Sequence, residues 1–344
     1  MNITELPSLY SDAERYVIVL FMSVIFIAAL IGNIVVIVVL GRDQALHSIS
    51  NFYLLNLSVA DLLVAIFFIG VTTMDLYVTE VWVFGDFLCR FVSFIQITST
   101  TVSILTLSLI AIERYILICK PIDLKLSVPL TKRLMLSSWI ISVVISSPQF
   151  YAKSKTDFMQ DNESYSFCLE TWPIDYARAY TVLYIFIFFV LPVCVMSLLY
   201  FKIAIKVKLS AKKASTNARR IPKASSKITK IFLLIMLSFS ISWTPVHTVS
   251  LWHYFHASYP NSTSTIRVLA PILYWLAWST AATNPLIYAF MNTQFQRSFK
   301  AMVRSSDRNS RSSQSAERRE YLYKLRKYDK EWKRRREEMK LTKL

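Results

Sequence analysis

The chain has 344 residues, of which 54% are hydrophobic and 18% are charged. A soluble chain of this length usually forms two or three domains whose apolar residues recur at the short period of a helix or a strand. Here the apolar residues form long blocks with almost no charge, and only four glycines occur. Because a helix needs about 20 mostly apolar residues to cross a bilayer, the composition excludes an ordinary soluble protein and indicates one membrane domain.

Seven such blocks follow one another along the chain. Six contain no charged residue, and the second is interrupted only by Asp61. We therefore predict an all-α membrane protein with seven transmembrane helices, divided into an N-terminal segment 1–16, a membrane domain 17–302 and a basic tail 303–344. In chain order the blocks are Tyr16–Leu40, Asn51–Met74, Phe91–Ile112, Leu134–Ala152, Ala179–Phe201, Ile231–Pro260 and Val268–Gln296.

The net charge of +17 does not indicate a nucleic-acid partner, because the excess lies in two segments beside these blocks. Residues 201–230 contain ten Lys or Arg and no acid, and residues 303–344 contain fifteen Lys or Arg against seven acids. Basic flanks of membrane helices stay in the cytoplasm. We predict a multi-pass plasma-membrane protein whose N-terminus is outside and whose C-terminus is cytoplasmic.

The four cysteines allow three pairings. With this orientation only Cys89 and Cys168 lie outside, where disulfides form. Cys119 lies at the inner end of the third span, and Cys194 lies within the fifth. We predict a Cys89–Cys168 disulfide and two free thiols.

Three N-glycosylation sequons also fall on the predicted outer side, at Asn2, Asn162 and Asn261. Such triplets are common by chance, so the use of each sequon and its chance occurrence are equal alternatives.

Ionisable residues inside spans are costly and therefore mark candidate functional sites. Asp61 is the only carboxylate deep in a span, and Ser103 and Asn284 offer further oxygen atoms. Carboxylate, hydroxyl and amide oxygens suit a hard cation such as sodium. A protonated Asp61 within a hydrogen-bond network is an equal alternative.

A second candidate is Glu113-Arg114-Tyr115, at the inner end of the third span. Arginine is always charged and forms bidentate hydrogen bonds. It can therefore bond locally in one state and to a partner protein in another, although a solvated helix end is the simpler reading.

Proline residues interrupt three spans. Pro245 follows Ser242-Trp243-Thr244 in the sixth block, and Pro192 and Pro285 lie in the fifth and seventh. Each proline removes a backbone donor and bends its helix. Membrane helices tolerate prolines, but three kinked helices favour a bundle that changes conformation.

Taken together, these motifs resemble those of rhodopsin-like (class A) G-protein-coupled receptors, and they occur in the family's order across residues 16–302. The resemblance implies a seven-helix receptor with a short amphipathic eighth helix and without enzymatic activity. The motifs are Gly32-Asn33, Asn56-Leu57-Ser58-Val59-Ala60-Asp61, Glu113-Arg114-Tyr115, Trp139, Trp243-Thr244-Pro245 and Asn284-Pro285-Leu286-Ile287-Tyr288.

The resemblance also implies roles for individual residues. Asp61, Ser103 and Asn284 match the sodium site, so that sodium is the one expected ion and no other cofactor is expected. The activation switch matches Pro192, Ile104, Phe239, Trp243 and Pro245. The residues for G-protein coupling match Glu113, Arg114, Tyr115, Tyr200 and Tyr288, and Phe295 and Phe299 match the apolar face of the eighth helix.

Four positions depart from the family's commoner pattern. Glu113 replaces Asp, Ser242 replaces Cys, and Thr280 stands where Asn is frequent. Ser225 stands where some members place an acid that holds Arg114 in the resting state. The resemblance then implies a weaker sodium site and a raised basal activity.

The ligand class follows from two positions. Amine receptors carry an Asp at the position of Gln96, and opsins carry a retinal-binding lysine at the position of Trp278. The remaining pattern is most similar to peptide receptors of the orexin, cholecystokinin and neuropeptide Y type. An extracellular neuropeptide is therefore the expected ligand, and a lipid or other small molecule is the alternative. The expected pocket consists of Gln96, Thr72, Tyr184, Trp243, His247, Tyr274 and Trp278.

The flanking segments suggest further partners. The loop 151–175 has the length of a hairpin over a wide pocket, and its acids would attract a basic peptide or serve only solubility. The basic segment 202–230 would frame the G-protein cleft and attract anionic membrane lipids. Phosphorylation of tail serines could recruit an arrestin-like partner. A transporter would show internal repeats, and an enzyme would show a catalytic set inside the spans; the sequence contains neither.

Overall fold

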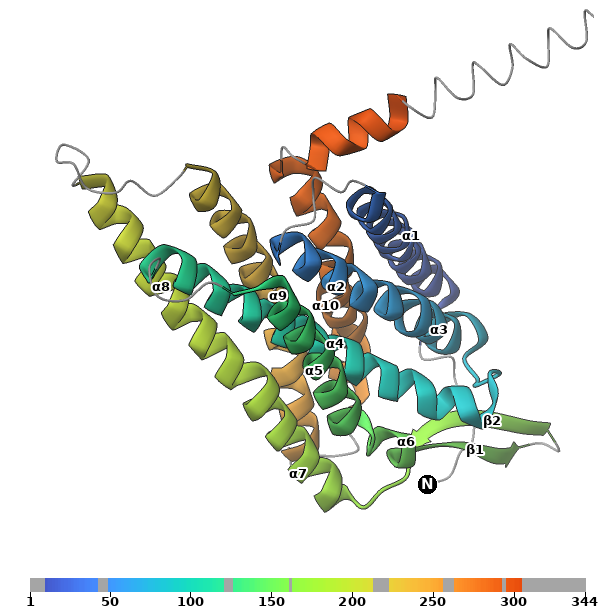
Figure 1. Cartoon of the computed structure of the whole chain (residues 1–344). Helices are drawn as coiled ribbons and strands as arrows, with labels where there is room; N and C mark the ends of the chain where they lie inside the picture. Colours follow the sequence, from blue (N-terminus) through green and yellow to red (C-terminus); the bar gives the residue numbers. More distant parts are fainter. Residues whose placement is uncertain are drawn as a thin grey trace, which may run out of the picture. The chain divides into compact units, whose positions relative to one another are not determined.

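The computed structural model describes residues 10–42, 49–120, 126–160, 163–212, 223–255, 263–292 and 295–304. Its long helices follow the seven predicted blocks one for one (Figure 1). The spans are α1 (Asp12–Arg42), α2 to η3 (Ile49–Thr79), α4 (Gly85–Cys119), α5 and α6 (Val128–Ala152), α7 to α8 (Ile174–Lys212), α9 (Lys223–Phe255) and α10 (Thr263–Met291).

Two helices, α1 and α5, begin several residues before their apolar blocks, each directly after a residue that caps the helix. Before α1, the Ser11 backbone N–H donates to Glu14 Oε2 at 2.8 Å, and the Glu14 N–H donates back to Ser11 Oγ at 3.4 Å. This reciprocal capping box satisfies two free backbone donors. In the same way Ser127 Oγ accepts from the Leu130 N–H at 3.3 Å and begins α5 (Val128–Ser146) six residues before its apolar block.

Two spans contain π-helical segments that the sequence analysis does not predict. The second span consists of α2 (Ile49–Leu63), η2 (Val64–Gly70), α3 (Val71–Thr73) and η3 (Met74–Thr79). The fifth consists of α7 (Ile174–Ile185), η4 (Phe186–Val190) and α8 (Leu191–Lys212). Pro192 gives a reason for η4, because its ring would clash with the carbonyl of Phe188 in a regular α-helix and a wider turn relieves that clash.

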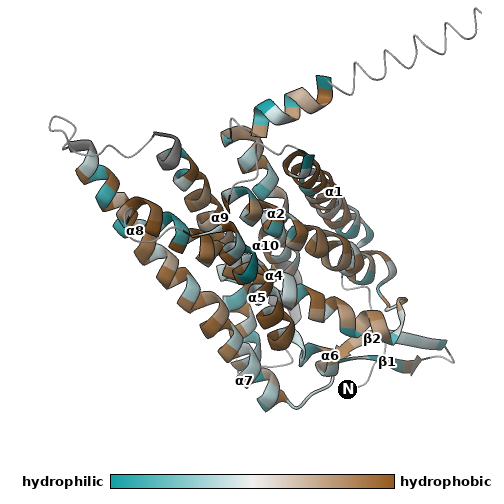
Figure 2. Ribbon diagram, viewed as in Figure 1, coloured by the Kyte–Doolittle hydropathy of each residue, from teal (hydrophilic) through white to brown (hydrophobic). Residues whose placement is uncertain are grey.

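Apolar side chains cover the outside of the bundle, and polar side chains face its interior. In α1, Leu20, Val24 and Ile31 are exposed, whereas Ala29 and Asn33 are fully buried. Figure 2 shows the same apolar character along the long helices and a more polar hairpin. This arrangement suits lipid as the solvent, because a bilayer favours apolar surface and disfavours polar groups.

The helices of the bundle pack against one another in a definite order. α1 packs on α2 and α10, α2 packs on α4, α4 packs on α5 and α8, and α9 packs on α10. Asn56 ties three spans together, because its Nδ2 donates to Thr106 Oγ1 at 2.7 Å and its Oδ1 accepts from Trp139 Nε1 at 2.9 Å.

A second polar link joins α1 to α10. Asn33 Nδ2 donates to the carbonyls of Ala29 at 2.8 Å and Ala281 at 2.9 Å. In a regular helix the Ala281 carbonyl would accept from residue 285, but Pro285 has no N–H. Asn33 therefore satisfies the acceptor that the proline leaves open. Gly32 permits this approach, since a Cβ there would lie 2.8 Å from Pro285 Cβ.

The fold is not purely helical, because the segment after the fourth span forms the predicted hairpin. β1 (Lys153–Gln160) pairs antiparallel with β2 (Glu163–Glu170). The short helix α6 (Gln149–Ala152) precedes β1, and the Thr171 N–H donates to the Ala152 carbonyl at 2.8 Å at the hairpin base. We call this the hairpin end of the bundle and the end near Arg114 the Arg114 end.

Among the described residues, six helices are long and apolar enough to cross a membrane. The seventh, α10, has 29 residues and carries several polar side chains, which lower its hydropathy. Residues 295–304 form a separate short helix, in agreement with the expected eighth helix. Asn2, Asn162, Asn261 and the tail serines lie outside the described residues.

Candidate functional site

A cavity of about 350 Å³ opens at the hairpin end between the second, third, fifth, sixth and seventh spans. Pockets of this size hold small ligands or a few residues of a larger one. Six of the seven predicted pocket residues line it: Gln96, Thr72, Tyr184, Trp243, His247 and Tyr274.

Trp278 does not line the cavity. Its side chain is 1% exposed and stacks on Tyr274, with ring centroids 5.0 Å apart. It also meets Phe68 edge to face at 4.8 Å. Trp278 therefore supports two lining rings from behind, since such aromatic pairs fix one another's orientation.

Three charged side chains line the cavity, and the pocket prediction contains none of them. Asp75 lies near the end of the second span, and Lys153 and Glu170 lie at the base of the hairpin. Lys153 and Glu170 are directly opposite partners in the antiparallel register. Tyr254 Oη donates to Glu170 Oε2 at 2.8 Å, and Trp172 Nε1 donates to Glu170 Oε1.

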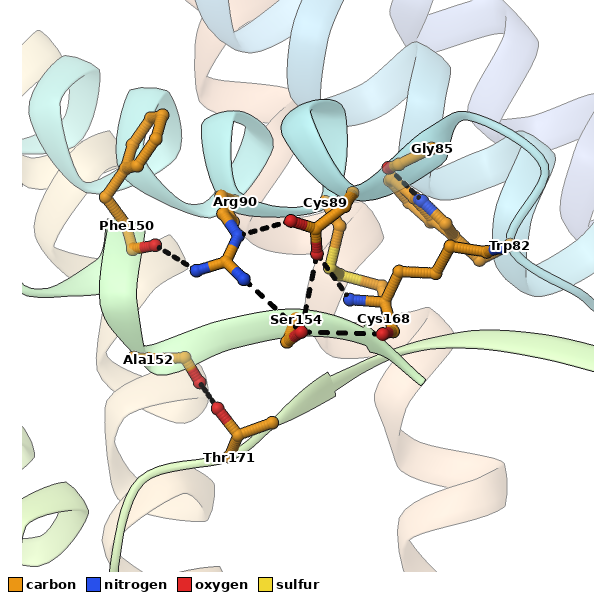
Figure 3. Close-up of a disulfide and its surroundings, with 11 residues drawn as sticks. Trp82, Gly85, Cys89, Arg90, Phe150, Ala152, Ser154, Cys168 and Thr171 are labelled. Carbon is orange, nitrogen blue, oxygen red and sulfur yellow. Dashed lines mark hydrogen bonds and ion pairs between the residues drawn. A yellow bond between two sulfur atoms is a disulfide. The ribbon is translucent and has the colours of Figure 1, made fainter. Parts of the chain in front are cut away.

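The hairpin is fastened to α4 by the predicted disulfide, whose sulfurs join Cys89 and Cys168 (Figure 3). Cys119 and Cys194 are free, as predicted. Arg90 of α4 strengthens the same attachment, since its Nη2 donates to Ser154 Oγ in β1 at 3.4 Å and its Nη1 donates to the Phe150 carbonyl in α6 at 3.1 Å. An ion pair within α4, between Arg90 Nε and Asp86 Oδ2 at 2.7 Å, holds the guanidinium in place.

Two backbone donors complete the attachment. The Lys155 N–H donates to Asp86 Oδ1 at 2.9 Å. The Trp82 N–H donates to the Ser166 carbonyl at 2.7 Å and thereby joins the loop between η3 and α4 to β2. Because both strands are held, the hairpin forms a fixed wall of the cavity.

The surroundings of two hairpin residues, Lys153 and Asp157, shift their pKa values. Burial lowers the pKa of the Lys153 amine, and the nearby Glu170 carboxylate opposes this effect in part. Hydrogen bonds from Ser166 and Lys155 lower the pKa of Asp157, which lies on the exposed face of the hairpin.

An aromatic column leads from the cavity floor into the bundle. On α9, Trp243 stacks between Phe239 and His247, with both centroid distances at 5.8 Å. From η4, Phe189 meets His247 at 4.4 Å and Phe239 at 6.4 Å. A displacement of Trp243 would therefore move Phe239, one turn deeper. The other predicted switch residues are Ile104, which is 1% exposed, the half-buried Pro192, and Pro245 inside α9.

Deeper in the bundle Asp61 lies opposite α10. Asn284 Nδ2 donates to Asp61 Oδ2 at 2.9 Å. Ser103 is buried without a bond to this pair, and Ser58 Oγ is buried without a hydrogen-bond partner among the described residues. Thr280 donates within its own helix to the Ala277 carbonyl at 2.7 Å.

At the Arg114 end, the arginine is 3% exposed and engaged locally. Its Nε donates to Glu113 Oε2 at 2.5 Å, and its Nη2 donates to Glu113 Oε1 at 2.6 Å and to Ser50 Oγ at 2.7 Å. From α9, the ring of Phe232 lies beneath the guanidinium, 5.7 Å from centroid to Cζ. Tyr200 and Tyr288 are buried, and Tyr115 is half-buried. In this arrangement Arg114 is closed to a partner protein.

Sequence reasoning missed Ser50, Phe232, Asp75 and Lys153 as site residues. A signal for Asp75 does exist, because Phe68, Thr72 and Asp75 are spaced by four and three residues and share one helix face. No local pattern could have found Lys153, since the hairpin register brings it to the cavity.

Comparisons with known proteins agree with this geometry. Residues 32–288 match the family model described as 7 transmembrane receptor (rhodopsin family). The chain is 30% identical over 305 residues to a QRFP-like peptide receptor of Branchiostoma floridae, a match that covers 86% of this chain and 79% of that protein. It is 28% identical to the mouse pyroglutamylated RF-amide peptide receptor, over 82% of this chain and 68% of that protein.

Mouse neuropeptide FF receptor 2 is 27% identical over 80% of this chain and 70% of that protein. The family is a class of receptors rather than enzymes, and its members are multi-pass proteins of the plasma membrane. From the family match across most of the bundle, the chain belongs to the rhodopsin family of seven-transmembrane receptors.

Proposed function

We propose that this receptor binds an extracellular peptide in the cavity at the hairpin end and activates a heterotrimeric G protein at the Arg114 end. The observation that carries the proposal is a cavity lined by amide, aromatic and charged side chains beneath a doubly fastened hairpin. Such a lining suits the polar backbone and mixed side chains of a peptide better than it suits a lipid tail.

The relatives supply a more specific ligand class. Their names describe receptors for QRFP-like, pyroglutamylated RF-amide and neuropeptide FF peptides. A peptide that ends in Arg-Phe-amide is therefore the first candidate. Its terminal amide can bond the side chain of Gln96, which both donates and accepts.

The proposed orientation places the hairpin outside the cell and the Arg114 end inside. The charge distribution supports it, since residues 201–230 carry ten basic residues and no acid. α8 and α9 extend into this segment, to Lys212 and from Lys223 respectively. These basic helix ends are also the proposed contacts with anionic lipids, and the tail serines are the proposed sites for an arrestin-like partner.

The proposed activation is a shift between two arrangements of the bundle. A ligand that binds the active arrangement better than the resting one shifts the population. Contact at Trp243 would move Phe239 and the part of α9 below Pro245. Phe232 would then leave the guanidinium of Arg114, and the arginine would become accessible to the G protein.

Sodium is the proposed modulator of the same equilibrium. Asp61 offers a carboxylate oxygen that Asn284 does not use, and the hydroxyls of Ser58 in the same span and of Ser103 in the third span are buried. These oxygen donors fit a hard cation. When bound, the ion would neutralise the buried charge of Asp61.

The experiment is expression in cells that carry a promiscuous G protein and a calcium reporter. We expect a dose-dependent response to amidated Arg-Phe peptides and none to a parallel panel of amines and lipids. Gln96→Ala and Trp243→Ala should remove the response, and Arg114→Gln should remove signalling while peptide binding is retained.

Trp275→Ala is the matched control, because Trp275 is 39% exposed and lines no part of the cavity. It should respond as the unaltered receptor does. A response to a lipid or an amine together with silence toward every peptide would refute the proposed ligand class.

A further inference from the structure

Asp75 stands apart from the other charged groups of the cavity. Its carboxylate lines the cavity and is half-buried. Among the described residues, it makes no hydrogen bond and no ion pair. Because a half-buried carboxylate loses hydration, it gains from a charged partner more than a solvated surface acid does.

The second carboxylate of the cavity, that of Glu170, already has partners within the protein. Both oxygens of Glu170 accept hydrogen bonds, one from Tyr254 and one from Trp172. Lys153 stands opposite Glu170 in the hairpin, and the two charges attract one another. The negative charge of Glu170 is therefore largely satisfied inside the protein.

The charges that line the cavity consequently do not balance. Lys153 compensates Glu170, and Asp75 is left as one uncompensated negative charge. Lys153 stands beside Glu170 in the hairpin register, and it forms no ion pair with Asp75 among the described residues.

The surroundings of the cavity suit a planar cation. Thr72, one turn before Asp75, offers a hydroxyl, and the rings of Trp82 and Tyr274 belong to the same lining. Guanidinium groups form bidentate bonds with carboxylates and stack on aromatic faces. Ammonium groups form the same ion pair without the planar fork.

We infer that Asp75 is the specificity-determining residue that receives a positively charged side chain, preferably a guanidinium, of the bound peptide. This inference rests on the proposed peptide-receptor function. The inference assigns the cation of the ligand to the second span, and it explains a preference of the cavity for basic ligands.

The test is a double-mutant cycle between receptor and ligand. Asp75→Asn is combined with two forms of one short peptide amide, which ends in Arg-Phe-amide or in citrulline-Phe-amide. Citrulline keeps the shape of arginine and removes its charge. Since a hydrogen bond to a charged group is the stronger kind, we expect Asp75→Asn to weaken the arginine peptide by about 10- to 100-fold.

On the unaltered receptor, the citrulline peptide should lose a similar factor. On the Asp75→Asn receptor, the citrulline peptide should be no weaker than the arginine peptide. A lysine peptide should lose less than the citrulline peptide, because it keeps the charge. Surface expression is measured in parallel, so that a receptor that fails to fold is recognised before potencies are compared.

Asp175→Asn is the matched control. It makes the same chemical change on an exposed carboxylate at the start of α7, whose only cost is a surface ion pair with Arg178. Asp175 does not line the cavity, so it reports mainly long-range steering and should shift potency by less than about threefold. Losses that multiply in the double mutant would overturn the assignment of Asp75 and leave the receptor function intact. An unaltered receptor that responds to none of these peptides would overturn the proposed peptide function, and the assignment of Asp75 with it.

Discussion

The link between Asn33 and Ala281 gives a prediction that can be worked out from the structure. Asn33 is fully buried, and its Nδ2 donates to two carbonyls, of which that of Ala281 has no helical donor because residue 285 is proline. Asn33→Ala therefore leaves a buried acceptor without a partner. Replacing Pro285 by alanine restores an N–H at the position that normally serves Ala281.

The loss of unfolding free energy in Asn33→Ala has two contributions. An interhelical hydrogen bond in a membrane contributes about 0.6 kcal/mol on average, and an unpaired buried polar group costs about 1–3 kcal/mol. We expect Asn33→Ala to lower the free energy of unfolding by about 2 kcal/mol, which corresponds to a melting temperature lower by about 5 °C.

The assay is thermal unfolding of the purified receptor in detergent, followed by tryptophan fluorescence, for the two single variants and the double variant. In the Pro285→Ala background, the Asn33→Ala loss should fall to about half or less, because the new N–H serves the carbonyl. An undiminished loss in that background would refute the account of Asn33 as the substitute donor. A single variant as stable as the unaltered protein would refute it as well.

Two further predictions concern the Arg114 end and the hairpin. Glu113→Gln weakens both bonds to Arg114 and should raise ligand-independent G-protein signalling up to about tenfold. Ser50→Ala removes one neutral acceptor of Arg114 and should raise this signalling less. Unchanged ligand-independent signalling in both variants would count against a closed Arg114. Lys153→Met should raise the melting temperature, because burial lowers the pKa of this amine and the folded state therefore disfavours its charge. That gain is complete below the folded-state pKa of Lys153 and disappears as the pH rises toward about 10.4, the ordinary lysine pKa; a gain that is independent of pH would refute the electrostatic reason.

The sequence by itself determined the architecture of this protein, because the bilayer imposes a simple rule. Blocks of about 20 apolar residues must become helices that satisfy their own backbone groups, and all seven helices lie where the blocks predicted them. The disulfide was also determined in advance, since compartment alone excluded the other pairings. Six of seven pocket positions were available from the family resemblance, because helix positions are fixed once the spans are aligned.

Only the tertiary structure decided the features that depend on the rotation of each helix about its axis and on the register of the two strands. The π-helical segments change which faces of the second and fifth spans meet the cavity, and no local pattern predicts η2 or η3. Trp278 left the predicted pocket because Tyr274 and Phe68 cover it. Asp75 lies in the cavity wall because it shares a helix face with Phe68 and Thr72, a spacing that the sequence does contain. Lys153 lies there because of the strand register, which no local pattern encodes.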